Sequence, residues 1–474
     1  MKKLNIVLTI ILIFFVTSLS VFAQNIKYDK KIGEKKYNEI VKTNGIYVDV
    51  NMTNYINRVG QRLVSNLDSA LFKYKFFIVD DYIPNAFALP GGYIFITKGL
   101  ISILNTEAEL AGVMAHEIIH ANNRHGIRQI KKRIIPVILT LPINIIGIVP
   151  CTGIITKPIM GAENLLFASY SRKFETEADE QGVTLASRSG YDPLALKRAL
   201  DRLMNVFEYL TGEKEQRNYL IDHPYTPTRE KSITEIAKKL RTVKIKPITN
   251  NFITEFKGLG YGKSTKKWIV KENIFIQASK DIYVEFPEFW RFSNFDTLIV
   301  AQSPHKDAVF SLSIVDSVVS VKEIGEQYLK KLSNKHKKVI VKSGACMVND
   351  TEAFEVKFEE ISFNDTIFGR TIWLPIGGNL VNINTISDIK KNNTINDIIG
   401  SLRTLSNKEK ESIMVQYLDI VRAKEKESVP ELCKRTQNMI KPSLTSIIND
   451  IDINKSLKKD QEIKVVKERV YIPK

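Results

Sequence analysis

The residues whose types and spacing could do chemistry are His116, Glu117 and His120, which form the pattern His-Glu-x-x-His. Two histidines four positions apart lie on one face of an α-helix, one turn from each other. Their imidazoles can bind one Zn²⁺ from the same side, and the glutamate between them can take a proton from a water that the metal activates. The pattern therefore predicts a hydrolytic zinc site. The alternative is a buried helix with two hydrogen-bonded histidines.

The helix that must carry this motif is marked by local signals. Thr106 and Glu109 have the spacing of a capping box, which predicts a helix that begins after Thr106. Apolar residues then recur at helical spacing, at Leu110, Val113, Met114, Ile118 and Ala121. The chain has six histidines, and three of them fall between residues 116 and 125.

A third metal ligand must come from elsewhere in the chain. Asn123 and Gly126 stand where the metzincin extension would have Gly and His, so that class is excluded. In the segment 171–179, Glu175 and Asp179 would share one face of a helix, whereas Glu177 would point about 200° away. One carboxylate can bind the metal while the other accepts the N–H of a ligating histidine. We expect Glu175 to be the ligand and Asp179 the acceptor; Glu177 as the ligand, or a solvated acidic face, are the alternatives.

Residues 116–120 (HEIIH) and 171–179 (SRKFETEAD) together resemble the CAAX prenyl protease family of gluzincin zinc metallopeptidases, which includes the HtpX heat-shock protease and a soluble periplasmic BepA-like branch. Residues 85–97 (NAFALPGGYIFIT) resemble the strand-turn-strand that precedes the zinc helix of the family. The resemblance covers about residues 28–240. It implies one Zn²⁺ per chain, hydrolysis of peptide bonds, and an edge strand that pairs with an extended protein or peptide substrate. That strand would be Asn85, Ala86, Phe87 and Ala88.

His223 and Arg229 resemble the late His-Pro…Arg element of the same family. A functional interpretation places both over the metal. His223 would donate a hydrogen bond to the oxyanion of the transition state, with Arg229 adding positive charge. In the resting protein the same loop could instead close and place His223 on the open metal position. The alternative is an exposed polar loop without a role.

The charge and the cysteine content of the chain indicate which kinds of binding partner to expect. The net charge is +17, yet no nucleic-acid motif with interleaved aromatic residues accompanies it, so we expect no nucleic-acid partner. A basic surface suits peripheral contact with a membrane or cell envelope, although a general lysine bias would give the same charge. The three cysteines, Cys151, Cys346 and Cys433, are too scattered for a disulfide framework.

Residues 1–23 have the features of a signal peptide. Lys2 and Lys3 precede an apolar run, and Ala23 stands at a candidate cleavage site, which predicts export to the periplasm or cell envelope. The alternative is an uncleaved segment that anchors the protein in the membrane. A second apolar stretch, residues 134–155, is interrupted by proline and glycine and is expected to form a buried or membrane-touching hairpin.

The predicted fold class is α+β. Residues 24–250 are expected to form a mainly α-helical zincin domain with a small antiparallel sheet, and to bind zinc by themselves. Two small α+β modules follow: an accessory domain at 265–405, and a β-α-α-β module at 412–474 with a weak resemblance to LysM modules.

Together these features predict an exported zinc metalloendopeptidase with Glu117 as general base, and the resemblance implies a role in cell-envelope protein quality control. The alternative is a catalytically quiet envelope chaperone or scaffold that retains the protease fold. An intact Glu117 argues against that alternative, since a scaffold needs no base there.

Overall fold

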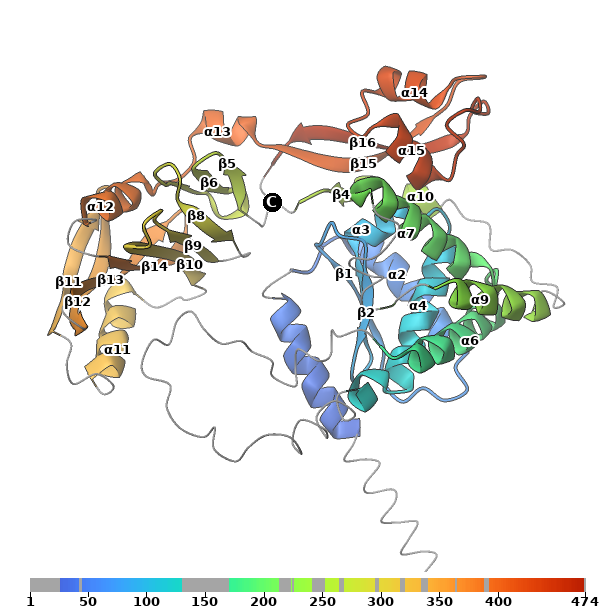
Figure 1. The fold of residues 1–474 in the computed structure, drawn as a ribbon, viewed down its shortest axis with the longest axis horizontal. Helices are drawn as coiled ribbons and strands as arrows, with labels where there is room; N and C mark the ends of the chain where they lie inside the picture. Colours follow the sequence, from blue (N-terminus) through green and yellow to red (C-terminus); the bar gives the residue numbers. More distant parts are fainter. Residues whose placement is uncertain are drawn as a thin grey trace, which may run out of the picture. The chain divides into compact units, whose positions relative to one another are not determined.

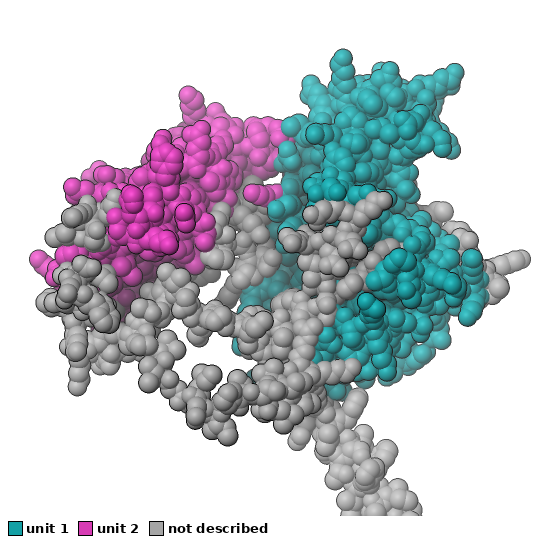
Figure 2. Space-filling model, viewed as in Figure 1, with its two compact units in different colours: residues 1–262, 416–467 teal, residues 263–415, 468–474 magenta. Residues whose placement is uncertain are grey.

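The computed structural model describes residues 26–41, 45–129, 170–212, 223, 226–240, 252–263, 268–294, 298–315, 320–333, 340–362, 365–387 and 392–472. These residues divide into two compact units, which Figure 2 colours separately. The first unit comprises residues 1–262 and 416–467, and the second comprises residues 263–415 and 468–474. The α+β class is confirmed, since both units combine helices with small sheets (Figure 1).

The expected signal peptide at 1–23 and the apolar stretch at 134–155 lie outside the described residues. Among the described helices, none combines the length and the apolarity that a membrane crossing requires.

The first unit places helices around a three-stranded sheet. The sheet has the order β1-β3-β2 and is mixed, whereas the sequence predicted an antiparallel one: β1 is parallel and β2 antiparallel to the central strand β3. Its strands are β1 (Lys75–Val79), β2 (Ala86–Leu89) and β3 (Tyr93–Thr97). The helices are residues 26–41, α2 (Val50–Val64), α3 (Lys98–Ile103), α4 (Glu107–Asn122), α6 (Arg172–Arg188), α7 (Ala195–Thr211), α9 (Pro227–Leu240) and α10 (Phe252–Glu255).

Residues 28–66, which the apolar pattern predicts as helical, form two helices with a break between them. The break contains a bridge from Ile46 to Val79, and Asp49 caps α2 by accepting a hydrogen bond from the backbone N–H of Met52. A capping aspartate stabilises a helix start and so favours a new helix at this point.

A tight turn joins β2 to β3. Gly91 and Gly92 both have positive φ, at 87° and 89°, which residues with a side chain rarely adopt. The turn thereby holds β2 at one end of the sheet order, beside β3.

The C-terminal segment of the first unit has the predicted order strand, helix, helix, strand. The elements are β15 (Met414–Arg422), α14 (Val429–Thr436), α15 (Pro442–Asn449) and β16 (Glu462–Val470). They pack on the helices of the first unit, because Leu418, Leu444 and Ile448 join the same apolar core as α2 and α4. A short strand, β4 (Gly260–Tyr261), extends their sheet by pairing with β15.

A buried lysine also joins this C-terminal segment to the N-terminal part of the first unit. Lys464 is 1% exposed, and its Nζ atom donates hydrogen bonds to the backbone carbonyls of Ser102 (2.9 Å) and Leu104 (2.8 Å). In the sequence, Ser102 and Leu104 lie between β3 and α4. The side chain of Lys464 in β16 therefore contacts the segment that leads into the helix with the His-Glu-x-x-His motif.

The second unit is built on a seven-stranded antiparallel sheet with the order β11-β12-β13-β14-β10-β9-β8 and a smaller sheet β5-β6-β7. Its strands are β5 (Ile269–Lys271), β6 (Ile274–Gln277), β7 (Ile282–Glu285), β8 (Arg291–Asn294), β9 (Leu298–Gln302), β10 (Ala308–Val315), β11 (Ile340–Val348), β12 (Thr351–Ser362), β13 (Asp365–Ile376) and β14 (Asn379–Ser387). Its helices are α11 (Val321–Ser333), α12 (Asn392–Ser401) and α13 (Asn407–Ser412).

Candidate metal centre

Helix α4 presents His116 and His120 on one face, and both side chains are buried. Its N-terminus forms as predicted, since the Thr106 hydroxyl accepts a hydrogen bond from the backbone N–H of Glu109 at 3.2 Å. In a capping box the Glu109 carboxylate would accept a hydrogen bond from the backbone N–H of Thr106. Here it accepts instead from the backbone N–H of the preceding residue, Asn105, at 2.7 Å. These caps fix the start of α4 and hence the places of its two histidines.

Helix α6 lies directly against α4. A Cβ atom added at Gly182 would stand 3.1 Å from the backbone Cα and N atoms of His116, so only glycine fits this approach without a shift. Glu175 and Asp179, one turn apart on α6, are thereby brought to the two histidines of α4.

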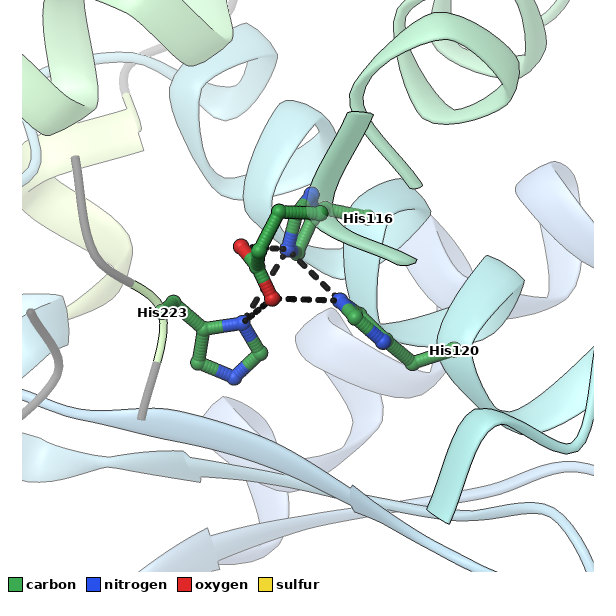
Figure 3. A group of neighbouring side chains, drawn as sticks. His116, His120 and His223 are labelled. Carbon is green, nitrogen blue, oxygen red and sulfur yellow. Dashed lines mark hydrogen bonds and ion pairs between the residues drawn. The ribbon is translucent and has the colours of Figure 1, made fainter. Parts of the chain in front are cut away.

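The structure gathers four side chains into one buried group: His116, His120, Glu175 and His223. Each offers one ligand-type atom, and these atoms all lie within 4.8 Å of one another. His116 Nε2 is 3.0 Å from His120 Nε2, and Glu175 Oε1 is 3.4 Å from His120 Nε2. Figure 3 shows the three imidazoles turned toward one another.

This donor set fits Zn²⁺, which takes imidazole nitrogens and carboxylate oxygens in a compact four-coordinate arrangement. Three ring nitrogens converge on one carboxylate in a site that is shielded from water. Such a concentration of electron-pair donors is what a bound cation would stabilise.

Glu117 is fully buried, and neither of its carboxylate oxygens has a hydrogen-bond partner among the described residues. Its Oε1 atom lies 3.6 Å from Nε2 of His223. Burial raises the pKa of the Glu117 carboxyl, although the neighbouring His223 and His116 act to lower it. A buried carboxylate with free lone pairs at this place can hold a water and accept its proton.

Asp179 contacts the other ring nitrogen of His116, with Oδ1 at 3.1 Å from Nδ1. Arg229 forms a bidentate ion pair with the Asp179 carboxylate: Nε donates to Oδ2 (2.7 Å) and Nη2 donates to Oδ1 (2.8 Å). Burial alone would raise the pKa of the Asp179 carboxyl, but the hydrogen bonds from Arg229 and His116 outweigh it and lower the pKa. Asp179 therefore stays ionised and can hold the His116 ring in one orientation.

Arg229 also joins the metal group to the loop that carries His223. Its Nη1 atom lies 2.7 Å from Oε2 of Glu175 and donates to the backbone carbonyl of His223 at 3.1 Å. The guanidinium is thus engaged by two carboxylates and one carbonyl, which suits a residue that positions its neighbours.

The buried environment shifts the pKa values of His120 and His223 in opposite directions. Burial lowers the pKa of His120 well below its ordinary value, so its ring is held neutral, as a metal ligand must be. Burial also acts to lower the pKa of His223, but the carboxylates of Glu175 and Glu117 outweigh it and raise the pKa to about 9.

The predicted substrate strand lies at one end of the sheet. Ala86, Phe87 and Ala88 belong to β2, and Asn85 directly precedes it. On its inner side β2 pairs with β3, and the Phe87 ring stacks on Phe95 with the ring centres 4.9 Å apart. In the sheet order of the described residues, β2 has no second strand beside it.

The sequence does not indicate two residues that lie close to the buried metal-binding group. The Tyr170 ring stacks on His120 with the ring centres 4.1 Å apart, and His125 is buried with Nδ1 at 3.0 Å from Nδ1 of His120. The only signal for His125 is its closeness in sequence to the motif. A tyrosine 50 positions downstream of His120 gives no signal at all.

Comparisons with known proteins agree with this geometry. Residues 51–237 match the model of peptidase family M48. The beta-barrel assembly-enhancing protease of Escherichia coli (strain K12) is 28% identical over 232 residues, which cover 47% of this chain and 46% of that protein. The corresponding protein of Yersinia pestis is 32% identical over 189 residues, which cover 38% of this chain and 37% of that protein.

The mitochondrial metalloendopeptidase OMA1 of Schizosaccharomyces pombe is 29% identical over 215 residues, which cover 44% of this chain and 61% of that protein. The chain thus spans about half the length of the curated relatives it matches. All the residues of the buried group fall inside the matched segment, and residues 51–237 therefore constitute a peptidase family M48 domain.

Proposed function

We propose that this protein is a zinc-dependent metalloendopeptidase in which His116, His120 and Glu175 hold the metal. The observation that carries the proposal is the buried convergence of these three side chains beside Glu117, a carboxylate without a hydrogen-bond partner among the described residues. A structural histidine pair would have no use for a buried glutamate that lacks a hydrogen bond, since leaving such a group unsatisfied costs free energy.

Bound zinc would act as a Lewis acid that polarises the peptide carbonyl and makes water a stronger acid. The residues of the chain supply the rest of the chemistry. Glu117 accepts the proton of the attacking water and passes it to the leaving amine, and its raised pKa brings it closer to the working range of a general base. Asp179 holds the His116 ring, and Arg229 keeps Asp179 charged and in place.

Substrate would bind as an extended strand beside β2, at Asn85, Ala86, Phe87 and Ala88. The support is the place of β2 at the end of the sheet order of the described residues, the place at which an extended peptide adds to a sheet. Binding through the main chain accepts many sequences, which suits an endopeptidase that cleaves unfolded segments.

His223 is proposed to cap the resting site. Its Nδ1 atom lies 3.3 Å from Nε2 of His116 and 3.0 Å from Oε1 of Glu175, among the ligand-type atoms themselves. In this arrangement the imidazole stands where a substrate carbonyl or a water would otherwise lie. Substrate binding must then displace the imidazole. The alternative is that His223 serves mainly as a hydrogen-bond donor to the reacting carbonyl.

For the physiological role, we propose that the protein acts in protein quality control at the cell envelope. Its support is the sequence pattern of residues 1–23 and the similarity to relatives named beta-barrel assembly-enhancing protease.

The test is zinc content together with casein hydrolysis of the exported protein. We expect one zinc per chain in the wild type and none in His120→Ala, with casein cleaved only by the wild type. Zinc binding that is unchanged in His120→Ala would overturn the ligand assignment, and a zinc-loaded wild type that cleaves no unfolded protein would favour the scaffold alternative.

A further inference from the structure

His120 is held at both of its ring nitrogens. Nε2 faces the buried group, 3.0 Å from Nε2 of His116, while Nδ1 lies 3.0 Å from Nδ1 of His125. His125 is 0% exposed and begins the short helical stretch that follows α4. Its ring stands nearly perpendicular to that of His120, with an angle of 81° between the planes.

Counting protons along this contact fixes the tautomer of each ring. A histidine that offers the Nε2 lone pair to a metal carries its proton on Nδ1. The Nδ1–H of His120 must therefore donate, and Nδ1 of His125 must accept. A neutral His125 then has its own proton on Nε2, on the far side of the ring.

The far side of His125 faces a carboxylate. Its Nε2 atom lies 3.5 Å from Oε2 of Glu177, too long for an ordinary hydrogen bond, and forms no hydrogen bond with a described residue, so the Nε2–H group and the carboxylate attract each other electrostatically. Glu177 is itself held in place, because its Oε1 atom accepts a hydrogen bond of 2.7 Å from the side-chain amide of Asn123. A continuous line of contacts thus runs from Glu177 through His125 to His120.

This line corresponds to the direct contact between Asp179 and His116, at 3.1 Å. Both carboxylates come from α6, but Glu177 points about 200° away from Glu175 around the helix and faces away from the metal group. It cannot reach His120 directly, and the ring of His125 bridges the remaining distance.

We propose that His125 is a positioning residue for the metal centre: it accepts the Nδ1 proton of His120 and, held by Glu177, fixes the tautomer and orientation of that ring. The proposal rests on the proposed function, in which His120 is a metal ligand. It gives each ligating histidine its own carboxylate on α6, one in direct contact and one through a second imidazole.

A packing role for His125 must be separated from this hydrogen-bonding role. The His125 ring also stacks on Phe174, with the ring centres 4.5 Å apart and the planes at 13°. His125→Phe keeps an aromatic ring on Phe174 but removes the acceptor. His125→Gln removes the ring but keeps an oxygen that can accept from His120 and an amide N–H that can donate to Glu177.

The experiment measures the zinc dissociation constant of the full chain by competition with a chelator. We expect His125→Phe to bind zinc about 10- to 100-fold more weakly than the wild type, the usual cost of removing such a support, and His125→Gln to stay close to the wild type. The reverse order, with Phe tolerated and Gln impaired, would assign His125 to packing and overturn the proposal.

A second pair of variants covers the case in which His125→Phe does not fold. Glu177→Ala should weaken zinc binding, whereas Glu180→Ala, an exposed position on the same helix, should not. Equal affinity in the two variants would also overturn the proposal. Wild-type affinity in His120→Ala would locate the failure in the ligand assignment of the proposed function instead.

Discussion

Nδ1 of His223 lies 3.0 Å from Oε1 of Glu175, inside the same buried group as the two histidines of α4. His223 comes from a segment far along the chain, yet it is as close to Glu175 as a ligand would be. In the proposed function, a side chain in this place must leave before a substrate carbonyl can enter.

The first prediction follows from this contact. His223→Ala should keep its zinc, since His116, His120 and Glu175 remain, and should cleave small peptides and casein faster than the wild type. A closed state favoured by about 1.4 kcal/mol would give about a tenfold rise. Rates are compared at equal zinc content. A fall in rate would show that His223 acts mainly on the transition state, and an unchanged rate would mean that it has no role.

The second prediction concerns the buried pair of Arg229 and Asp179. Arg229→Met leaves two buried carboxylates without their cation, so we expect the metal-free protein to lose about 3–5 kcal/mol of unfolding free energy. Arg198→Met is the control, because the Arg198 side chain is 37% exposed and its loss should cost less than about 1 kcal/mol. Urea unfolding of both variants measures the difference, and equal stabilities would contradict a supporting role for Arg229.

The third prediction concerns Lys464. Lys464→Met removes the donor to two buried carbonyls, those of Ser102 and Leu104, which should cost about 1–3 kcal/mol. Lys459→Met, at an exposed position of the same segment, should be neutral. Thermal unfolding checks both, and a Lys464→Met variant as stable as Lys459→Met would mean that these hydrogen bonds contribute nothing.

The sequence alone predicts that the fragment 24–250 binds zinc by itself, whereas the packing of the C-terminal segment predicts that this fragment is unstable. It contains every proposed ligand but lacks Leu418, Leu444 and Ile448, three buried members of the core around α2 and α4. Exposing that core to water is unfavourable, so the fragment should be unstable unless residues 416–467 are added as a separate chain. Zinc binding by a soluble, folded fragment 24–250 would contradict this expectation.

The fourth prediction concerns removal of the metal. A metal that binds only the folded state stabilises it by mass action, by about 4 kcal/mol at a thousandfold excess over the dissociation constant. Chelator treatment should therefore lower the melting temperature of the wild type, and added zinc should restore it. His120→Ala serves as the control and should not respond. A wild-type melting temperature that ignores the chelator would mean that the buried group holds no metal.

Local patterns made part of this molecule predictable from its sequence. The start of α4 after Thr106 and the strand at Tyr93–Thr97 depend on neighbours in the chain, so capping chemistry and apolar spacing were enough to find them. The approach of Glu175 to His116 and His120 was likewise predictable, because few residue types can bind a metal beside a His-Glu-x-x-His motif.

Other features depend on contacts that no local pattern encodes. In the sequence, Lys464 looks like an ordinary lysine of a strand. Only folding brings it to the carbonyls of Ser102 and Leu104, about 360 residues away in sequence. His125 lies five residues after His120, a spacing that the helix geometry of α4 does not bring to the metal-binding face. The chain turns after Asn123, where Arg124 has a positive φ of 56°, and this turn directs His125 back toward His120.

The most direct test of the account is the Glu117→Gln variant, because it changes the proposed base and leaves all three proposed ligands. Zinc content and casein hydrolysis are measured together on the same preparation. The account predicts one zinc per chain, as in the wild type, with hydrolysis lower by about 10²- to 10⁴-fold, the usual contribution of a general base. A Glu117→Gln protein that holds zinc and cleaves casein at the wild-type rate would contradict it.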